Sequence, residues 1–358
     1  MSLSIGIVGL PNVGKSTLFN ALTNSSIVAA NYPFATIEPN TALAPVPDAR
    51  LQVLEQLYHA AKVVPAVVTF VDIAGLVAGA SKGEGLGNKF LANVRECDAI
   101  VHVVRAFADD SVIHVANKIQ PRDDIEVINT ELMLADLQTI EQRLLRLQKE
   151  AKANPKIKET AAYIEELKTQ LQQGTPLNKI AGLKHELIQD LHLLTAKPVL
   201  YVFNVNEAGL ADTEQKHTLS QLVAPAQAIF ICAKLEEELR ELDAADAKEL
   251  LATYGQTTSG LEQLVSAAYH TLGLQSYLTA GPKEVRAWTI KQGNTAPQAA
   301  GVIHTDFERG FIAAQVVSYH DLVAAGSETA AKAAGKVRTE GRDYVMQPDD
   351  VVEFRFNV

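Results

Sequence analysis

The segment Gly9 to Ser16, with the sequence GLPNVGKS, constrains the fold of this chain more than any other feature. It matches G-x-x-x-x-G-K-[ST], follows an apolar run and opens a segment of helical character, which is the setting of a phosphate-binding loop. Glycines let the backbone turn its N–H groups toward phosphate oxygens, and the helix adds partial positive charge at its N-terminus. The segment therefore predicts a nucleoside triphosphate site. The alternative, a chance glycine-rich turn, leaves the flanking strand and helix unexplained.

The residues of this loop have separate predicted roles. Lys15 reaches the β- and γ-phosphates and is a candidate catalytic residue, and the Ser16 hydroxyl coordinates Mg²⁺. The other nucleotide contacts predicted here are Asn12, Val13, Gly14 and Thr17.

Two further parts of the Mg²⁺ and γ-phosphate site are expected downstream. Asp72 to Gly75 follows an apolar run and matches D-x-x-G. We predict that Asp72 holds Mg²⁺ through water and that the Gly75 N–H senses the γ-phosphate. Thr36 lies between the two motifs, and its hydroxyl is the candidate that completes the Mg²⁺ shell. Taken alone, Thr36 would be an ordinary loop residue.

The base is predicted from the segment Asn204-Val205-Asn206-Glu207, where guanine-specific hydrolases of this class carry N-K-x-D. An aspartate there accepts from guanine N1–H and from the exocyclic amine. Glu207 adds a methylene and the lysine is absent, so a contact worth roughly 1.5–3 kcal/mol is degraded. We expect ATP to be preferred, with GTP accepted weakly or comparably. The predicted base contacts are Asn204, Val205, Glu207, Cys232 and Ala233.

The group that positions the attacking water is not evident. Many related switches carry a glutamine directly after D-x-x-G, but Leu76 occupies that position here. Slow intrinsic hydrolysis follows, unless another group or a partner supplies the contact. His114 is the catalytic candidate in the chain, with a solvated or packed histidine as the alternative. Because related hydrolases without the glutamine often hold K⁺ with an asparagine at the place of Asn12, stimulation by K⁺ is a further hypothesis.

The order of apolar and helical segments predicts an α/β fold of the P-loop NTPase, GTPase-like type with a largely parallel sheet. Strands are expected at residues 4–8, 67–71, 99–104, 198–203 and 228–231. The nucleotide-binding domain is then expected to span residues 1–125 and 197–276.

Residues 126–196 interrupt this domain with a different pattern. Apolar residues recur at spacings of four and three on both sides of Asn154-Pro155. This predicts two antiparallel helices packed along a coiled-coil-like seam. We interpret them as an inserted arm that contacts a partner; an ordinary pair of core-packing helices is the alternative.

Residues 277–358 are predicted to form a separate α+β domain. Strands are expected at 284–290, 311–317 and 351–356. Four cations of this domain are candidates for an RNA-binding face, with a charge-balanced solvated surface as the equal alternative: Lys332, Lys336, Arg338 and Arg342.

Composition limits the remaining classes. The formal net charge of −10 disfavours indiscriminate nucleic-acid binding, which requires a basic surface. Only two cysteines, Cys97 and Cys232, disfavour a disulfide framework and fit a reducing compartment. No apolar run approaches membrane-spanning length, and the first residues do not resemble a secretory signal. We expect a cytoplasmic protein, a monomer, without a membrane partner.

Taken together, these motifs resemble the YchF subfamily of Obg-like ATPases, within the translation-factor-related P-loop GTPases. The resemblance rests on residues 9–20, 31–37, 72–77, 87–90, 204–207, 284–289 and 304–311. It implies an ATPase with Mg²⁺ as cofactor, an inserted coiled coil, and a C-terminal TGS domain of β-grasp fold. It also implies association with the ribosome, as the large subunit or the 70S particle, and a role as a nucleotide-dependent switch in translation or stress response. A dedicated GTPase and a scaffold that binds nucleotide only structurally are the alternatives.

Overall fold

The computed structural model describes residues 3–24, 40–73, 86–108, 119–150 and 155–357. They divide into two compact units. The first takes in the described residues of 3–24, 40–42 and 69–268, and the second those of 43–68 and 269–357. No helix within the described ranges is both long and apolar enough to span a membrane.

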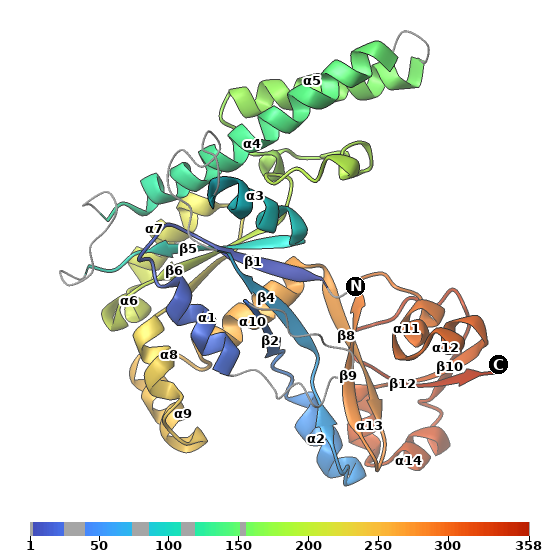
Figure 1. Cartoon of the computed structure of the whole chain (residues 1–358). Coiled ribbons are helices and arrows are strands. Elements are labelled where there is room, and N and C mark those ends of the chain that lie inside the picture. Colours follow the sequence, from blue (N-terminus) through green and yellow to red (C-terminus); the bar gives the residue numbers. More distant parts are fainter. Residues whose placement is uncertain (1–2, 25–39, 74–85, 109–118, 151–154, 358) are drawn as a thin grey trace. The chain divides into compact units, whose positions relative to one another are not determined.

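The first unit is built on a six-stranded sheet with the order β2-β4-β1-β5-β6-β7 (Figure 1). Its neighbouring strands from β4 to β7 are parallel. Every residue of β5 is buried, as expected for a strand covered on both faces. The strands are β1 (Ser4–Val8), β2 (Thr41–Pro45), β4 (Val67–Asp72), β5 (Ala99–Arg105), β6 (Val199–Asn204) and β7 (Ala228–Ile231). The expected α/β fold with five strands at these places is confirmed, and β2 is an edge strand that the sequence pattern did not reveal.

Helices connect these strands, and three of them begin shortly after the carboxyl end of a strand. α1 (Lys15–Asn24) follows β1, α6 (Glu207–Ala211) follows β6, and α8 (Ala233–Leu239) follows β7. The others are α3 (Leu86–Glu96), α7 (Thr213–Val223), α9 (Ala244–Thr253) and α10 (Gly260–Thr271).

Two long helices, α4 (Pro121–Glu150) and α5 (Pro155–Gln172), lie side by side and extend away from the sheet (Figure 1). The buried side chains along them form one apolar seam, which three short turns between residues 177 and 191 help to cover. Asp136 on α4 holds the segment that leads back to the sheet. Its carboxylate accepts from the backbone N–H groups of Leu194 and Thr195, both at 2.8 Å, and from the Thr195 hydroxyl. The first turns of α4 differ from the arm, since Ile125 belongs to the core formed with β5 and β6.

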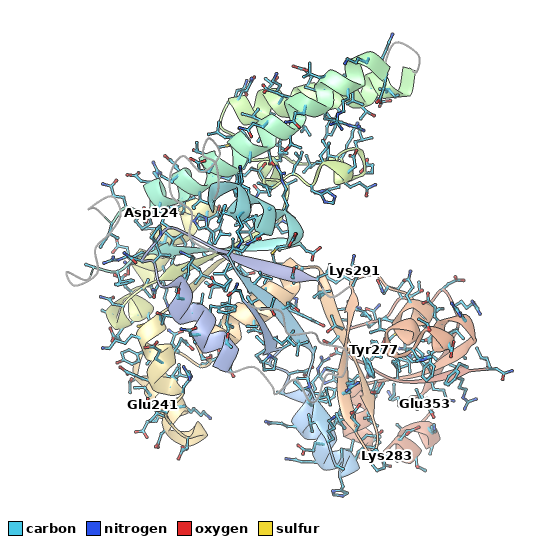
Figure 2. The ribbon with its side chains drawn as sticks, in the orientation of Figure 1. Asp124, Glu241, Tyr277, Lys283, Lys291 and Glu353 are labelled. Atoms are coloured by element: carbon cyan, nitrogen blue, oxygen red, sulfur yellow. The ribbon has the colours of Figure 1, made fainter. Side chains whose placement is uncertain are left out.

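The second unit contains another six-stranded sheet, with the order β11-β10-β12-β8-β9-β3. An antiparallel hairpin of β8 and β9 precedes the helices, and β12 then pairs with β8 in parallel, which gives the β-grasp arrangement. Tyr277, which is labelled in Figure 2, lies in the core of this unit. It is fully buried, and its hydroxyl donates to the carbonyl of Ala299 at 2.9 Å. The strands are β3 (Val63–Val64), β8 (Leu274–Ala280), β9 (Val285–Lys291), β10 (Phe311–Ser318), β11 (Arg338–Glu340) and β12 (Asp350–Phe356).

Part of this unit comes from far upstream. Val63 and Val64 pair in parallel with β9, and α2 (Arg50–Tyr58) lies in the same unit. Arg50 forms ion pairs with Asp48 at 2.7 Å and with Asp349 at 3.1 Å. The remaining helices are α11 (Ala296–Ile303), α12 (Thr305–Arg309), α13 (Tyr319–Ala325) and α14 (Glu328–Ala333).

The four cations considered for RNA binding all have protein partners. Lys332 pairs with Glu328, Lys336 with Asp321 at 3.1 Å, and Arg338 with Glu340 at 3.6 Å. Arg342 donates to the carbonyl of Phe311 at 3.1 Å. Their surroundings are therefore closer to a charge-balanced surface than to a concentrated basic face.

Candidate nucleotide-binding site

Four connecting loops meet at the carboxyl edge of the parallel sheet. They follow β1, β5, β6 and β7, and ligands of open α/β sheets bind at this edge. The strand register brings them together, because Val8 pairs with His102, Arg105 with Asn204, and Asn204 in turn with Ile231. The loops line an open cavity of about 650 Å³. Its lining is Asn12, Gly14, Lys15, Ser16, Thr17, Phe107, Ala108, Asn204, Val205, Asn206, Glu207, Cys232, Ala233, Lys234 and Glu237.

The phosphate-binding loop has the backbone conformation that its sequence requires. Asn12 and Gly14 have φ values of 61° and 96°, a region that favours glycine and tolerates asparagine. A Cβ atom added at Gly14 would lie 2.3 Å from Nδ2 of Asn204. Gly14 is therefore needed both for its backbone angle and for the close approach of a neighbouring loop. α1 begins directly afterwards at Lys15, with Ser16 and Thr17 in its first turn.

Asn204 connects three of the four loops. Its Nδ2 donates to the carbonyl of Val13 at 3.1 Å, and its Oδ1 accepts from the backbone N–H of Ala233 at 3.2 Å. The residue is only 6% exposed. Both ends of this amide are used by the protein, so Asn204 holds the phosphate-binding loop in register with the loop after β7. Val13 itself is buried, and its carbonyl rather than its side chain makes this connection.

Lys15 lines the phosphate end of the cavity. Its Nζ donates to the carbonyl of Leu10 at 2.7 Å, and the residue is 9% exposed. Burial lowers the pKa of Lys15 to about 8, opposed by the negative charge of Asp72. Burial likewise raises the pKa of Asp72, opposed by Lys15. The two groups thus lie within electrostatic reach of each other, Asp72 at the end of β4 and Lys15 at the start of α1.

The oxygen donors at this end suit a hard divalent cation. Ser16 is exposed in the first turn of α1. Asp72 is the last residue of β4 and pairs with Ile7 of the neighbouring strand β1. Hydroxyl and carboxylate oxygens completed by phosphates and water form the usual Mg²⁺ environment of nucleotide sites. The residues present therefore fit Mg²⁺.

A buried histidine beneath the loop was missed by the sequence reasoning. His102, on β5, is 2% exposed, and its ring centroid lies 5.3 Å from that of Tyr201. Burial, and then the charge of Lys15, lower the pKa of His102 to about 3. The imidazole is therefore neutral at physiological pH and adds no charge next to the lysine.

The other end of the cavity is formed by exposed side chains. Glu207, the first residue of α6, pairs with Lys234 in the first turn of α8 at 3.1 Å. A bond from its own backbone N–H, and then Lys234, hold the pKa of Glu207 below its usual range. Val205 stands where a guanine reader has lysine. Asn206, at the variable position of the pattern, accepts from the Gly209 N–H at 2.9 Å and caps α6.

Comparison with known proteins identifies the family of the chain. The sequence profile YchF-GTPase_C, described as a protein of unknown function, matches residues 274–357, and the profile MMR_HSR1, described as a 50S ribosome-binding GTPase, matches residues 4–143. The "Ribosome-binding ATPase YchF" of Bacillus subtilis is 50% identical, and that of Haemophilus influenzae 51% identical, each over the full length of both chains. The chain belongs to the YchF family.

Solved structures agree with this assignment to the YchF family. The Schizosaccharomyces pombe YchF GTPase is 39% identical and superposes with a TM-score of 0.88, covering 99% of this chain and 98% of that one. A GTP-binding protein from Pyrococcus horikoshii, 21% identical, has a TM-score of 0.61 over 99% of this chain and 100% of that one, which shows a shared fold.

The structure brings most of the predicted site residues of this YchF-family chain to one cavity. Val13 and Asp72 are described but do not belong to its lining, and three further predicted residues lie outside the described residues. These three are Thr36, Gly75 and His114. Phe107, Ala108, Lys234 and Glu237 line the cavity although the sequence reasoning did not assign them to the site. Phe107 and Ala108 directly follow β5, so their position at the carboxyl edge was the available signal. The Arg105 guanidinium lies 4.6 Å from the centroid of the Phe107 ring, and Arg105 Nε donates to the Phe107 carbonyl at 3.1 Å.

Proposed function

We propose that the chain is a Mg²⁺-dependent nucleoside triphosphate hydrolase that prefers ATP and binds the ribosome. The observation that carries the proposal is the junction at Asn204, which joins the phosphate-binding loop to the loops expected to hold the base. One cavity therefore presents phosphate-binding and base-binding groups together. Its volume of about 650 Å³ is within the range usual for small-molecule and cofactor sites.

At the phosphate end, the chemistry follows from the loop and its lysine. Lys15 now donates to the carbonyl of Leu10, and a bound triphosphate would offer its Nζ anionic oxygens instead. Ser16 and Asp72 would hold Mg²⁺, which neutralises charge on the β- and γ-phosphates when bound. The backbone N–H groups around Gly14 and the N-terminus of α1 complete an environment that stabilises negative charge.

At the base end, the groups favour adenine over guanine. The Glu207 carboxylate is engaged by Lys234, and Val205 stands at the lysine position, so the N-K-x-D arrangement is not repeated. Phe107 and Val205 add apolar surface on which either purine can lie. The relatives' names differ on this point, since the bacterial proteins are named ATPases and the Schizosaccharomyces pombe protein a GTPase. Use of GTP alongside ATP is therefore part of the proposal.

The activation of water stays a prediction. Leu76 and His114 lie outside the described residues, so slow intrinsic hydrolysis and the part played by His114 rest on the sequence. Stimulation by K⁺ through Asn12 is likewise a hypothesis that rests on the sequence. Equal turnover in Na⁺ and K⁺ buffers would exclude the K⁺ hypothesis, and unchanged turnover of His114→Ala would remove that histidine from the mechanism.

Ribosome binding is proposed from the relatives. The Bacillus subtilis and Haemophilus influenzae proteins are named ribosome-binding, and they align with this chain from end to end. The arm of α4 and α5 is an extended helical pair with a buried apolar seam, suited to contact a partner. We propose further that nucleotide controls this contact, as a cytoplasmic switch in translation or stress response.

Turnover of ATP and GTP by the full chain and by Lys15→Ala tests the enzymatic part. We expect Lys15→Ala to lose at least about 100-fold in turnover, since it removes a charge-assisted contact to the transferred phosphoryl group. Lys248→Ala, at an exposed position on α9, is the matched control and should retain turnover. Equal turnover of Lys15→Ala and the wild type would overturn the proposal.

Cosedimentation with ribosomes, with and without nucleotide, tests the second part. Retention of the Lys15→Ala variant by ribosomes, together with loss of turnover, would show that the two functions separate. If the wild type binds ribosomes and nucleotide but hydrolyses neither ATP nor GTP, the scaffold alternative is correct. If it hydrolyses GTP alone, it is a dedicated GTPase.

A further inference from the structure

Lys234 stands at the lysine position of the S-A-K element that guanine readers carry, and it pairs here with Glu207, which replaces the aspartate of N-K-x-D. The two residues come from different loops, after β6 and after β7, and both line the cavity. The Lys234 Nζ lies 3.1 Å from Oε1 of Glu207 and 3.9 Å from Oε1 of Glu238. Of its two acidic neighbours, only Glu207 belongs to the cavity lining.

We propose that Lys234 is a specificity-determining residue, which lowers the affinity for guanine by occupying the carboxylate of Glu207. The inference rests on the proposed nucleotide hydrolase function and names a residue that sets its base preference. Guanine presents two donors side by side, at N1–H and at the exocyclic amine, and a free carboxylate accepts from both. A carboxylate that already accepts from an ammonium group has its charge compensated, so this attraction is reduced.

The same pair removes a penalty against adenine. Adenine presents an acceptor at N1 beside the donor at N6, and a free carboxylate repels the N1 lone pair. When Lys234 neutralises Glu207, the repulsion decreases and the ammonium is a donor at the same edge. The pair therefore weakens both the attraction of the carboxylate for the two guanine donors and its repulsion of adenine N1.

The exposure of the pair limits the size of the effect. The side chain of Lys234 is 72% exposed and that of Glu207 is 34% exposed, so solvent screens the interaction. We expect the ratio of dissociation constants for GTP and ATP to change by about fivefold rather than by orders of magnitude.

The test measures the affinities of Mg·ATP and Mg·GTP for the full chain by isothermal titration calorimetry. Lys234→Met should lower the ratio Kd(GTP)/Kd(ATP) by about fivefold, whichever nucleotide the wild type prefers. Lys234→Arg retains the cation and should keep the ratio close to that of the wild type. Glu238→Gln is the matched control, because it removes the other acidic neighbour of Lys234 without changing the cavity lining.

A double-mutant cycle separates this mechanism from a general effect of charge. In a Glu207→Gln background the carboxylate is absent, so Lys234→Met should no longer change the ratio. The inference is overturned if Lys234→Met leaves the ratio unchanged, or if it changes the ratio equally with and without Glu207. Failure of the wild type to bind either nucleotide would instead overturn the proposed function, and the inference with it.

Discussion

The two ends of the nucleotide cavity are built in different ways. At the phosphate end, the geometry is set by backbone angles and by buried groups, with Gly14 in close approach to Asn204 and Lys15 covered by its surroundings. At the base end, the exposed pair of Glu207 and Lys234 defines the chemistry.

This difference predicts how strongly substitutions at each end of the cavity affect stability and nucleotide affinity. At the phosphate end, each change disturbs a packed junction of loops. An ion pair at the surface costs little to remove or reverse, because water already screens it. We therefore expect large, general losses from changes at the phosphate end and small, selective shifts from changes at the base end.

The largest effect is expected for Gly14→Ala. The new Cβ would lie 2.3 Å from Nδ2 of Asn204 at a φ of 96°, which alanine rarely adopts. Steric crowding and backbone strain together should lower the free energy of unfolding by roughly 2–4 kcal/mol. Because the loop must shift to relieve the contact, ATP and GTP should both bind at least ~100-fold more weakly. Urea denaturation and calorimetric titration measure the two quantities.

Gly174→Ala separates the contribution of steric crowding from that of backbone strain. Gly174 has a φ of 80°, but nothing lies within 4 Å of an added Cβ. It should cost about 1 kcal/mol and leave nucleotide affinity unchanged. If Gly14→Ala behaves like Gly174→Ala in both measurements, the contact with Asn204 does not determine the phosphate end.

A tenfold effect is expected from pH, through Lys15. The pKa of Lys15 is about 8 in the folded chain, below its usual 10.5. The unfolded chain thus binds more protons between these values, so burial of charged Lys15 destabilises the nucleotide-free fold, and this cost disappears as pH rises from about 8 to 10.5. Phosphate binding requires the charged form, so affinity should fall about tenfold between pH 7 and pH 9.

Calorimetry in buffers of different ionisation enthalpy checks this, since binding at pH 9 should take up close to one proton. Lys15→Arg remains charged throughout, so its affinity should not decline over this range. Lys234→Met should keep the wild-type pH profile, because it changes only the base end. Loss of the profile in Lys234→Met would show that the two ends are electrostatically coupled.

The sequence was sufficient to locate the phosphate end. The motif from Gly9 to Ser16 has fixed spacing, and short apolar runs identify the parallel strands, so β1 and β7 begin and end at the predicted residues. Both signals are local in the chain. The β-grasp fold of the C-terminal unit is likewise predicted from the resemblance, although β8 was missed because a domain boundary was expected inside it, at residue 277.

Most of the contacts that were not predicted join distant residues. Nothing local indicates that Val63 and Val64 pair with β9, or that Lys234 reaches Glu207. The capping of α6 by Asn206 is a local contact that was also not predicted, because the comparison with N-K-x-D concerned Val205 and Glu207 rather than the variable position between them. Short polar residues before a helix are common N-caps, so a local signal for this role was present.

The smallest effect that tests the comparison is that of Asn206→Ala. Its side chain accepts from the Gly209 N–H at 2.9 Å, and loss of an N-cap typically costs about 1 kcal/mol. The free energy of unfolding should fall by this amount, and both nucleotides should weaken alike, with Kd(GTP)/Kd(ATP) constant within about twofold. Asn206→Asp keeps an acceptor oxygen and should retain the stability. If Asn206→Ala changes the ratio as much as Lys234→Met does, then helix capping as well as charge sets the base preference, because the position of Glu207 depends on the start of α6.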